Sequence, residues 1–251
     1  MDDVRLVIAE EGGCTTNYLE AFDTAPELAG RVAAWGMHCY NSYPDVSGVV
    51  DHMRRGPFKN SRIWMTEYGD LDQTGEREYF FSWTIFDRLL YILEHGMQGA
   101  LNWDAFDNYH DHDEYWTIYG IIRTGLRTFT RKKRYYACKQ VYRFVRSGMT
   151  RVGISCSGDN VGALGFFDRT TGRYTVTGVN RGVEAVYLRL LKKNLTGEQM
   201  AARPAAFVTT DALDCAPVPC EPLRPWAGGT EGYETVIPAK SMFTITTQTS
   251  A

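Results

Sequence analysis

The chain has 251 residues, enough for one large domain or two modest ones with ample hydrophobic core. Hydrophobic residues make up 44% and charged residues 23%, ordinary values for a globular protein, and the formal net charge of -3 speaks against a nucleic-acid or membrane-surface partner. No stretch is apolar enough to span a bilayer, and residues 1–15 carry no signal-peptide pattern.

The first part of the chain alternates short apolar strands with helices. Residues 4–9 form a β-branched run that is typical of a strand buried on both faces, and Gly96 is a natural helix terminator. Four strand–helix units in succession predict parallel strands joined by right-handed crossovers. The predicted strands are 4–9, 33–40, 63–66 and 99–103, and the predicted helices are 17–22, 25–32, 44–55, 76–95 and 134–146.

Polar and aromatic side chains stand where each predicted strand ends. Because α/β barrels keep catalytic groups at the carboxyl ends of their strands, this joint placement predicts an active site. Each residue also has a structural alternative: Glu67 can cap its loop or pair with an arginine, and His38 can be a satisfied core histidine. Trp103 can cap the barrel, and at least one of the two adjacent glutamates can lie on a solvated loop. In chain order the set is Glu10 and Glu11, His38 and Tyr40, Glu67, and Asn102 and Trp103.

After Gly148 the sequence changes to short strands separated by turn residues, which predicts a β-sandwich and a domain boundary near Ser147–Gly148. Residues 213–232 are rich in Pro and Gly and are predicted to form a long loop. Within it, the spacing of Cys215 and Cys220 allows a small disulfide loop, which the redox compartment would decide. The predicted strands are 151–155, 161–168, 173–180, 185–190, 206–210 and 241–247.

Several short motifs occur in the order in which one enzyme family has them. Residues 64–69, Trp-Met-Thr-Glu-Tyr-Gly, resemble the nucleophile motif at the end of barrel strand seven. Residues 38–40 resemble the His-x-Tyr that ends strand six, and Trp103 resembles the aromatic residue that ends strand eight. Residues 176–181 resemble a V-V-x-N-R strand, and residues 238–242 resemble a closing P-A-x-S strand. The ordered set resembles retaining glycoside hydrolases of clan A, most closely glycoside hydrolase family 30.

The resemblance implies the C-terminal half of a (β/α)8 TIM barrel followed by a β-sandwich. Residues 1–147 would supply barrel strands five to eight with their helices, and residues 148–251 would form the sandwich. It implies a glycosidase that acts on a β-linked glycan, with a carbohydrate as substrate, no cofactor and no metal. For the full-length protein, secretion or a periplasmic location is expected. The implied nucleophile is Glu67, and the implied substrate-binding residues are His38, Tyr40, Trp103, Asn102 and Glu11.

The resemblance also exposes a gap. In this clan the acid/base is a Glu that follows an Asn at the end of strand four, and the chain contains no Asn-Glu pair. Glu10 and Glu11 follow Ala9 on the presumed fifth strand, so they do not match that position. We therefore expect a truncated gene or partial sequence whose partner is a missing N-terminal half-barrel. The chain alone should then be inactive, with exposed strand edges that favour aggregation or dimers.

The implied chemistry requires these residue types. Retaining hydrolysis uses two carboxyl groups about 5–5.5 Å apart, one as nucleophile and one as acid and then base. A hydrogen bond from Tyr40 would favour the ionised nucleophile, and His38 would orient that network or contact a sugar hydroxyl. Trp103 would offer a flat apolar face to a sugar ring. Without the partner acid, the rate should fall on the order of 10²–10⁴-fold.

Three alternatives remain open at this stage. The loop with Asp104, Asp107 and residues 110–113 is rich in carboxylates and imidazoles, but adjacent residues rarely converge on one metal ion. We expect this loop to line the cleft and set substrate choice. A non-catalytic carbohydrate-binding or structural module is a second reading, and another barrel hydrolase with Glu10 or Glu11 as acid is a third. An upstream segment with four more strand–helix units and an Asn-Glu pair would favour the enzyme.

Overall fold

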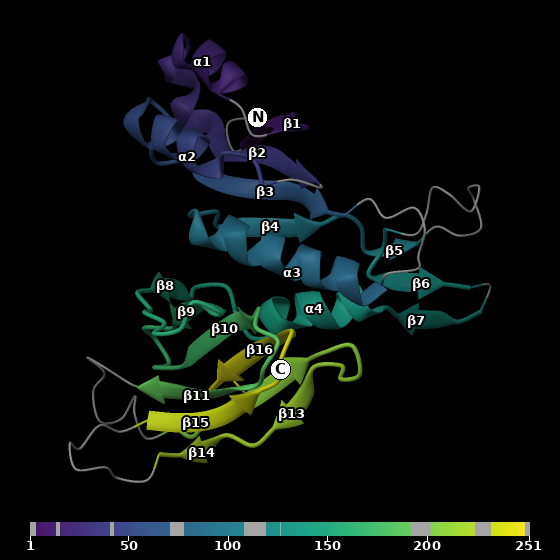
Figure 1. Cartoon of the computed structure of the whole chain (residues 1–251). Helices are drawn as coiled ribbons and strands as arrows, with labels where there is room; N and C mark the ends of the chain where they lie inside the picture. The colour runs from purple at the N-terminus through teal and green to yellow at the C-terminus, as the bar shows by residue number, and fades with distance from the viewer. Residues whose placement is uncertain are drawn as a thin grey trace. The chain divides into compact units, whose positions relative to one another are not determined.

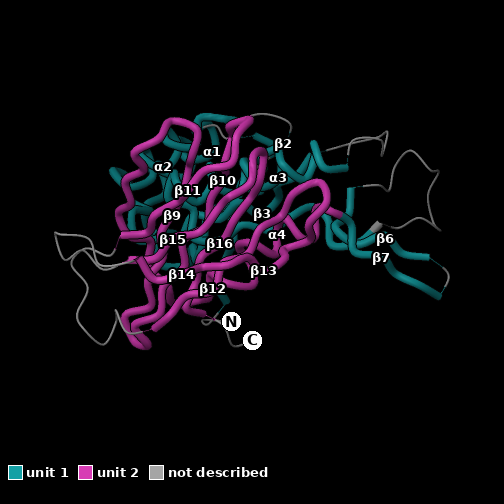
Figure 2. The backbone as a smooth tube through the Cα atoms, turned by 60° about the horizontal axis from the view of Figure 1, so that its bottom comes forward, with its two compact units in different colours: residues 1–132 teal, residues 133–251 magenta. Residues whose placement is uncertain are grey.

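The structure, a computed structural model of the whole chain, has two compact units, residues 1–132 and 133–251 (Figures 1 and 2). The sequence predicts a domain boundary near Ser147–Gly148, whereas the two units divide between residues 132 and 133, before the helix that begins at Lys133. The residues that the structure describes are 4–13, 16–40, 43–70, 78–107, 119–125, 127–191, 202–223 and 232–248.

The first unit is built on a four-stranded parallel sheet. Its strands lie side by side in chain order, so every neighbouring pair is joined by a crossover connection (Figure 1). This is the order and direction that the alternation of strands and helices predicts. The strands are β1 (Leu6–Glu11), β2 (Val32–Tyr40), β3 (Arg62–Gly69) and β4 (Gly99–Asn102).

Two short helical segments connect β1 to β2. The first, α1 (Asn17–Asp23), lies where the sequence predicts a helix. The second was expected to be an α-helix over residues 25–32, but it is a 3-10 helix, η1 (Pro26–Arg31). The tighter 3-10 form is common in connectors of only a few residues, and Pro26 occupies its first turn as predicted.

Two longer helices follow β2 and β3. Asp45 caps the N-terminus of α2 (Val46–Arg55), and its side chain accepts a hydrogen bond from the Gly48 amide at 2.9 Å. α3 (Glu78–Glu94) packs against β3 and β4, and Gly96 follows it with a φ of 93°, the left-handed conformation that glycine adopts without strain. Among the described residues, no helix combines the length and the apolar character that crossing a bilayer requires.

A small additional sheet follows β4 within the first unit. It consists of β5 (Phe106–Asp107), β6 (Ile122–Thr124) and β7 (Phe129–Arg131), in that order. The sequence predicts a loop over this whole stretch, because strands of two or three residues are too short for a hydrophobic period to show. Figure 1 shows β6 and β7 as a hairpin that extends beyond the end of β4.

The second unit consists of two antiparallel sheets with a shared core. The six-stranded sheet has the order β13-β12-β16-β10-β9-β8, and the three-stranded sheet has the order β11-β15-β14. Val208 and Phe243 of the larger sheet and Ile237 of the smaller one belong to a single buried cluster, as in a β-sandwich. The strands are β8 (Thr150–Val152), β9 (Val161–Phe167), β10 (Tyr174–Asn180), β11 (Val186–Leu191), β12 (Ala205–Thr209), β13 (Ala216–Val218), β14 (Glu221–Pro222), β15 (Gly232–Ile237) and β16 (Ser241–Thr246).

The predicted long loop over residues 213–232 is wrong in part. β13 and β14 lie within it, and β15, which the sequence pattern missed, begins at its end. Pro217 and Pro222 obscured these strands, since proline removes a ladder hydrogen bond and is confined to sheet edges. β13 and β14 are indeed the edge strands of their sheets. Residues 224–231 lie outside the described part.

Cys215 and Cys220 remain separate thiols, both buried. The disulfide that their spacing allows is therefore not formed. The extended strand β13 occupies residues 216–218 and holds the two cysteines on either side of it. Burial raises the pKa of both thiols above the ordinary value, so both stay protonated at neutral pH.

The helix α4 (Lys133–Tyr142) packs against the six-stranded sheet through buried threonines. Strand alternation places Thr175 and Thr244 on the face opposite the shared core. Thr244 donates a hydrogen bond to the Gln140 carbonyl of the helix at 2.7 Å, and Thr175 donates one to the carbonyl of Phe144, just after the helix, at 2.9 Å. These contacts make the helix part of the second unit, which explains why the units divide before it.

Candidate active site

Three of the predicted site residues meet at the carboxyl ends of β2 and β3. The Tyr40 hydroxyl donates a hydrogen bond to Oε2 of Glu67 at 2.5 Å. Nδ1 of His38 lies 3.3 Å from the same oxygen. The sheet register accounts for this, because His38 is the direct partner of Glu67 and Tyr40 is the partner of Gly69. A carboxylate, an imidazole and a phenol thus converge on a single oxygen atom.

A β-bulge in β3 turns Glu67 toward His38. Met37 of β2 pairs with Met65, but the next residue, His38, pairs with Glu67, so β3 contains one extra residue, Thr66. In a regular strand Glu67 would share the face of Met65, which is fully buried. The bulge moves the carboxylate to the opposite face, in keeping with the general use of bulges to redirect side chains beside active sites.

A second carboxylate, Glu10, joins the group. The sequence places it among the strand-end residues, but the family resemblance assigns substrate binding to Glu11 and not to Glu10. Its Oε2 lies 3.2 Å from Nε2 of His38. Glu10 is the extra residue of a bulge in β1, since the residues before and after it pair with Gly36 and Met37. The sequence shows two adjacent glutamates at this strand end, and only the bulge determines that Glu10 faces His38. Of Glu11, the structure describes the backbone alone, which pairs with Met37.

Asn102 and Trp103 attach the end of β4 to β3. The Asn102 side-chain amide donates to the Tyr68 carbonyl at 3.1 Å, and the Trp103 backbone amide donates to the same carbonyl at 2.8 Å. Position 69 must be glycine, because a Cβ there would lie 2.6 Å from the Trp103 carbonyl oxygen. Asn102 therefore holds the backbone next to Glu67, while the Trp103 side chain, 44% exposed, remains accessible to a ligand.

A buried ion pair fixes the chain where β3 ends. Arg88 of α3 donates to Oδ1 of Asp70 at 2.5 Å and to the Gly69 carbonyl at 3.0 Å, and both charged side chains are buried. Cys39 lies beside this pair, and burial raises the pKa of its thiol to about 11 despite the opposing effect of Arg88. Sequence reasoning missed the pair, although an arginine among the apolar positions of α3 was the available signal.

The surroundings of Tyr40 keep its phenol protonated. Burial raises the pKa of Tyr40, and the hydrogen bond to Glu67 raises it further, because a phenolate beside a carboxylate would repel it. Tyr40 therefore remains a hydrogen-bond donor throughout the neutral range. Hydrogen bonds to a carboxylate favour its ionised form, which is the form that a nucleophile requires.

Part of the predicted site lies outside the described residues. Residues 108–118 include most of the loop of carboxylates and imidazoles, among them 110–113, so its predicted position beside the cleft stays a prediction. Within the described part of the chain, no group of three or more His, Cys, Asp or Glu side chains could hold a metal ion.

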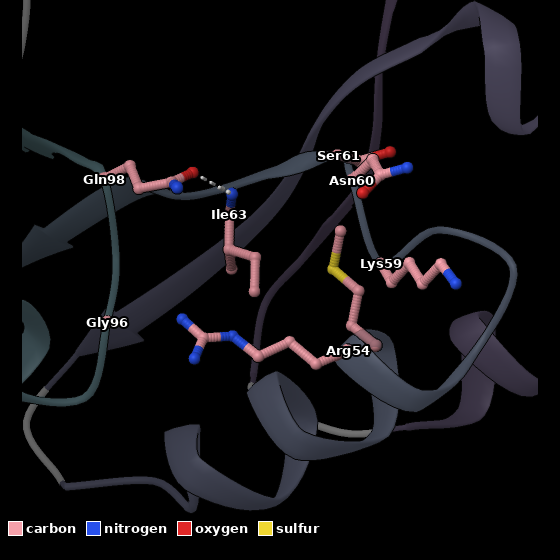
Figure 3. Close-up of a pocket in the computed structure, with 8 residues that line it drawn as sticks. Arg54, Lys59, Asn60, Ser61, Ile63, Gly96 and Gln98 are labelled. Carbon is pink, nitrogen blue, oxygen red and sulfur yellow. Dashed lines mark hydrogen bonds between the residues drawn. The ribbon is translucent and has the colours of Figure 1, made fainter.

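A separate hollow of about 420 Å³ lies at the opposite, amino-terminal edge of the sheet (Figure 3). It is lined in part by Arg54 and Lys59, by Ile63 at the start of β3 and by Gln98 before β4. The Gln98 side chain accepts a hydrogen bond from the Ile63 amide at 3.2 Å. Arg54 and Lys59 point in different directions, so their charges do not converge on one ligand position (Figure 3). The hollow is distinct from the carboxylate cluster at the other end of the strands.

Comparisons with known proteins identify the fold. No protein-family model and no curated protein sequence matches the chain. A GH30 endoxylanase from Clostridium papyrosolvens C71 matches its structure with a TM-score of 0.74 at 18% identity, over 97% of this chain and 56% of that chain. Xyn30A, a xylanase of glycoside hydrolase family 30 subfamily 8 from Clostridium acetobutylicum, matches with a TM-score of 0.74 at 19% identity, over 98% of this chain and 56% of that chain.

A third solved structure extends the comparison beyond xylanases. The endo-β1,6-glucanase BT3312 matches with a TM-score of 0.60 at 14% identity, over 92% of this chain and 44% of that chain. The chain therefore spans about half the length of the solved structures that it matches. Identities this low establish a shared fold, and that fold is one found in glycoside hydrolase family 30, as the strand-end motifs predicted.

Proposed function

We propose that the chain is the part of a retaining glycoside hydrolase that carries the nucleophile, Glu67. The observation that supports this most directly is the hydrogen bond from Tyr40 to Oε2 of Glu67 at the carboxyl end of β3, within a fold shared with family 30 xylanases. Barrel enzymes keep their catalytic groups at these strand ends. A carboxylate that merely capped a loop would not require the bulge that directs it at His38 and Tyr40.

The contacts of Glu67 assign different tasks to its two oxygens. Tyr40 and His38 both approach Oε2. Among the described residues no side chain hydrogen-bonds to Oε1, which leaves that oxygen to attack the anomeric carbon. The attack forms a covalent glycosyl-enzyme, and water then releases the sugar with net retention. Tyr40 stabilises the carboxylate before attack and again when the ester is cleaved.

The proposed substrate is a β-linked glycan. Solved structures with this fold include xylanases and an endo-β1,6-glucanase. The Trp103 ring is accessible beside the end of β3 and offers a sugar ring a flat apolar face, so we assign it as the stacking platform. His38 and Asn102 complete the proposed site: the former orients Glu67, and the latter holds the backbone of Tyr68 in place.

We further propose that β1 to β4 are strands five to eight of a (β/α)8 barrel and that the acid/base lies on its N-terminal half. In the described sheet β1 and β4 are the edge strands, each with an open side to which further strands could pair. Leu6 and Val7 on β1 and Leu101 on β4 are exposed apolar side chains. The partner half-barrel would cover these edges and bring a second carboxyl within about 5–5.5 Å of Glu67.

The experiment that tests this function labels the nucleophile. A 2,4-dinitrophenyl 2-deoxy-2-fluoro-β-glycoside has a leaving group that departs without protonation, so it traps the glycosyl-enzyme without help from the acid/base. A panel of xylosides and glucosides is offered to the protein with its N-terminal half-barrel supplied. We expect the adduct on Glu67, placed within residues 64–68 by peptide mass mapping, and no adduct in Glu67→Gln.

The matched control is Glu27→Gln, which removes an exposed carboxylate from η1 and should label as the unaltered protein does. An adduct on Glu10, or labelling that persists in Glu67→Gln, would contradict the assignment. The absence of any adduct across the panel would count against a retaining glycosidase.

A further inference from the structure

Glu10 has no task in the chemistry above, yet the backbone is shaped to direct it at His38. Ala9 and Glu10 have φ angles of 75° and 50°, in the left-handed region that residues other than glycine rarely adopt. Two such residues in succession form the bulge of β1 and interrupt its pairing with β2. Strained backbone of this kind persists where the surrounding structure requires it, and it is concentrated at functional sites.

The neighbouring strand leaves room for the Glu10 carboxylate. Gly36 of β2 lies two residues before His38, on the same face of the strand. A Cβ at Gly36 would lie 2.6 Å from Oε1 of Glu10, well inside van der Waals contact. The Glu10 carboxylate therefore occupies the space that the Cβ of any other residue at position 36 would fill. The bulge and the glycine are independent features of two strands, and both serve to place one side chain.

His38 lies between two carboxylates. Its Nε2 is 3.2 Å from Oε2 of Glu10, and its Nδ1 is 3.3 Å from Oε2 of Glu67. A neutral imidazole has one N–H and can donate to only one of these oxygens, whereas an imidazolium donates to both. Each ring nitrogen thus faces one carboxylate, and the His38 ring connects Glu10 to Glu67. The His38 side chain is 15% exposed, which limits competition from water for either nitrogen.

We propose that Glu10 is a positioning residue for the nucleophile: through His38, it keeps an N–H directed at Oε2 of Glu67. This inference rests on the proposed role of Glu67. The N–H supports the carboxylate before attack and again as the carboxylate leaves the sugar in the second step, together with Tyr40. Glu10 touches neither the sugar nor the reacting oxygen in this account, so it differs from the reading in which it is the acid.

The first test observes His38 directly and does not depend on activity. Nitrogen-15 NMR of labelled histidine distinguishes protonated from unprotonated ring nitrogens, and the spectrum of His38→Gln assigns the His38 signals. We expect a proton on Nδ1, the nitrogen that faces Glu67. In Glu10→Gln the amide oxygen can still accept from Nε2, but the negative charge is gone, so the Nδ1 signal should move. Glu27→Gln should leave both signals in place.

A second variant tests whether the position of the Glu10 carboxylate, and not the change of residue 10 itself, causes the shift of the Nδ1 signal. Gly36→Ala places a Cβ where the Glu10 carboxylate lies and displaces it without altering any titratable group. It should move the same Nδ1 signal as Glu10→Gln. If both variants fold and neither changes the His38 signals, the relay through His38 is wrong.

The second test is a double-mutant cycle in the protein with its N-terminal half-barrel supplied. Glu10→Gln should lower kcat/KM by about 10- to 100-fold, the range expected for losing one hydrogen bond to a charged group. In a His38→Gln background the same change should have little further effect, because the two residues act in series. Independent, multiplicative effects would overturn the proposal. So would azide rescue of Glu10→Ala with formation of a glycosyl azide, which would make Glu10 the acid/base.

The two proposals fail in different ways. If the fluoroglycoside labels Glu67 but Glu10→Gln leaves the His38 signals unchanged, Glu67 is the nucleophile and the positioning role of Glu10 is wrong. If the signals move as expected but no fluoroglycoside labels Glu67, the relay exists and the proposed function is wrong.

Discussion

The carboxyl-end edge of the parallel sheet and the interior of the sandwich use polar side chains in opposite ways. On the sandwich sheet, Thr175 and Thr244 are fully buried, and their hydroxyls donate to carbonyls of the segment 133–144 that packs on it. At the edge of the parallel sheet, Glu10, His38 and Glu67 are partly exposed, with side-chain exposures of 47%, 15% and 28%. The threonines pair neutral donors with neutral acceptors, whereas the edge gathers two carboxylates around one imidazole.

The difference indicates which groups serve stability and which serve chemistry. A satisfied buried hydroxyl has completed its hydrogen bonding and can do nothing further for a ligand. Two carboxylates on either side of one imidazole, on a bulged and partly strained backbone, are a costly arrangement, and proteins tolerate such sites where they carry function. Substitutions in the sandwich should therefore change the free energy of unfolding, while those at the strand ends should mainly change activity.

The largest expected effect is on the free energy of unfolding. It concerns the buried ion pair of Arg88 and Asp70, which lies at the end of β3 and is an exception to this division. Arg88→Met should lower the free energy of unfolding by about 3–5 kcal/mol, because it leaves the charge of Asp70 buried without its cation. Activity should fall as well, since Arg88 also holds the Gly69 carbonyl at the end of β3. Urea unfolding followed by tryptophan fluorescence measures the first effect.

Two further variants sharpen this prediction. Arg54→Met removes an exposed cation from α2 and should change the unfolding free energy by no more than about 0.5 kcal/mol. Combining Arg88→Met with Asp70→Asn removes both charges and should recover part of the loss. An Arg88→Met protein as stable as the unaltered one would show that the ion pair does not hold the end of β3.

The next effect in size concerns Tyr40 and tests whether the edge serves chemistry. Tyr40→Phe should lower kcat/KM by about 10- to 100-fold, because Glu67 loses a hydrogen bond from a neutral donor to its charged oxygen. Steady-state kinetics on an aryl β-glycoside, in the protein with its N-terminal half-barrel, measures the change. A variant with unaltered activity would separate Tyr40 from the reaction.

Tyr40 also predicts a pH dependence of stability. Its pKa is raised in the folded protein, so the unfolded chain loses the phenolic proton first as pH rises. The stabilisation from protonated Tyr40 is therefore fully present below the ordinary tyrosine pKa of about 10 and is lost above it. Between neutrality and that point, unaltered protein and Tyr40→Phe should show parallel stability curves. At higher pH the unaltered protein should lose stability more steeply.

Much of the first unit followed from the sequence, because its signals are local. Apolar β-branched runs, helix periodicity and terminators such as Gly96 predicted four strands and their crossovers in the right order. The prediction that residues 4–9 are buried on both faces was wrong, because Leu6 and Val7 are exposed on this edge strand. The short strands were harder to predict. In the sandwich β13 and β14 contain prolines, and in the first unit β5 to β7 have two or three residues each, so tertiary pairing rather than local preference makes them strands.

The candidate site could be predicted in composition but not in geometry. The strand ends identified His38, Tyr40 and Glu67 as neighbours, since parallel strands end at one edge. Two bulges were not predicted from the sequence. The extra residue Thr66 in β3 turns Glu67 to the face of His38, and the bulge at Glu10 in β1 directs that glutamate at His38. A one-residue bulge changes the register of a strand without a sequence signature of its own, so only the structure shows which glutamate faces the imidazole.

A smaller effect is expected in the sandwich. Thr244→Val keeps the shape of the side chain but removes the hydroxyl that donates to the Gln140 carbonyl at 2.7 Å. The carbonyl retains a longer hydrogen bond from Thr177 at 3.4 Å, so the loss should be about 1 kcal/mol of unfolding free energy, with activity unchanged. Thr170→Val, on an exposed turn, is the matched control and should have no measurable effect. A loss of activity without a loss of stability would reverse the proposed division of tasks.

The smallest effect leaves the sequence unaltered and compares thiols in both units. Burial raises the pKa of Cys39 to about 11 and raises the pKa of Cys215 and Cys220, so these buried thiols are almost wholly protonated at pH 8. Cys156 also has a raised pKa, yet it is exposed and accessible. Iodoacetamide at pH 8 should therefore modify Cys156 first among these four, as peptide mass mapping would show. Because labelling of a buried thiol requires local opening, the rates at Cys39 and Cys215 compare the rigidity of the two cores. Faster modification of Cys39 would mean that the strand behind the candidate site opens more readily than the sandwich, which is the expected order if function is gathered at that edge.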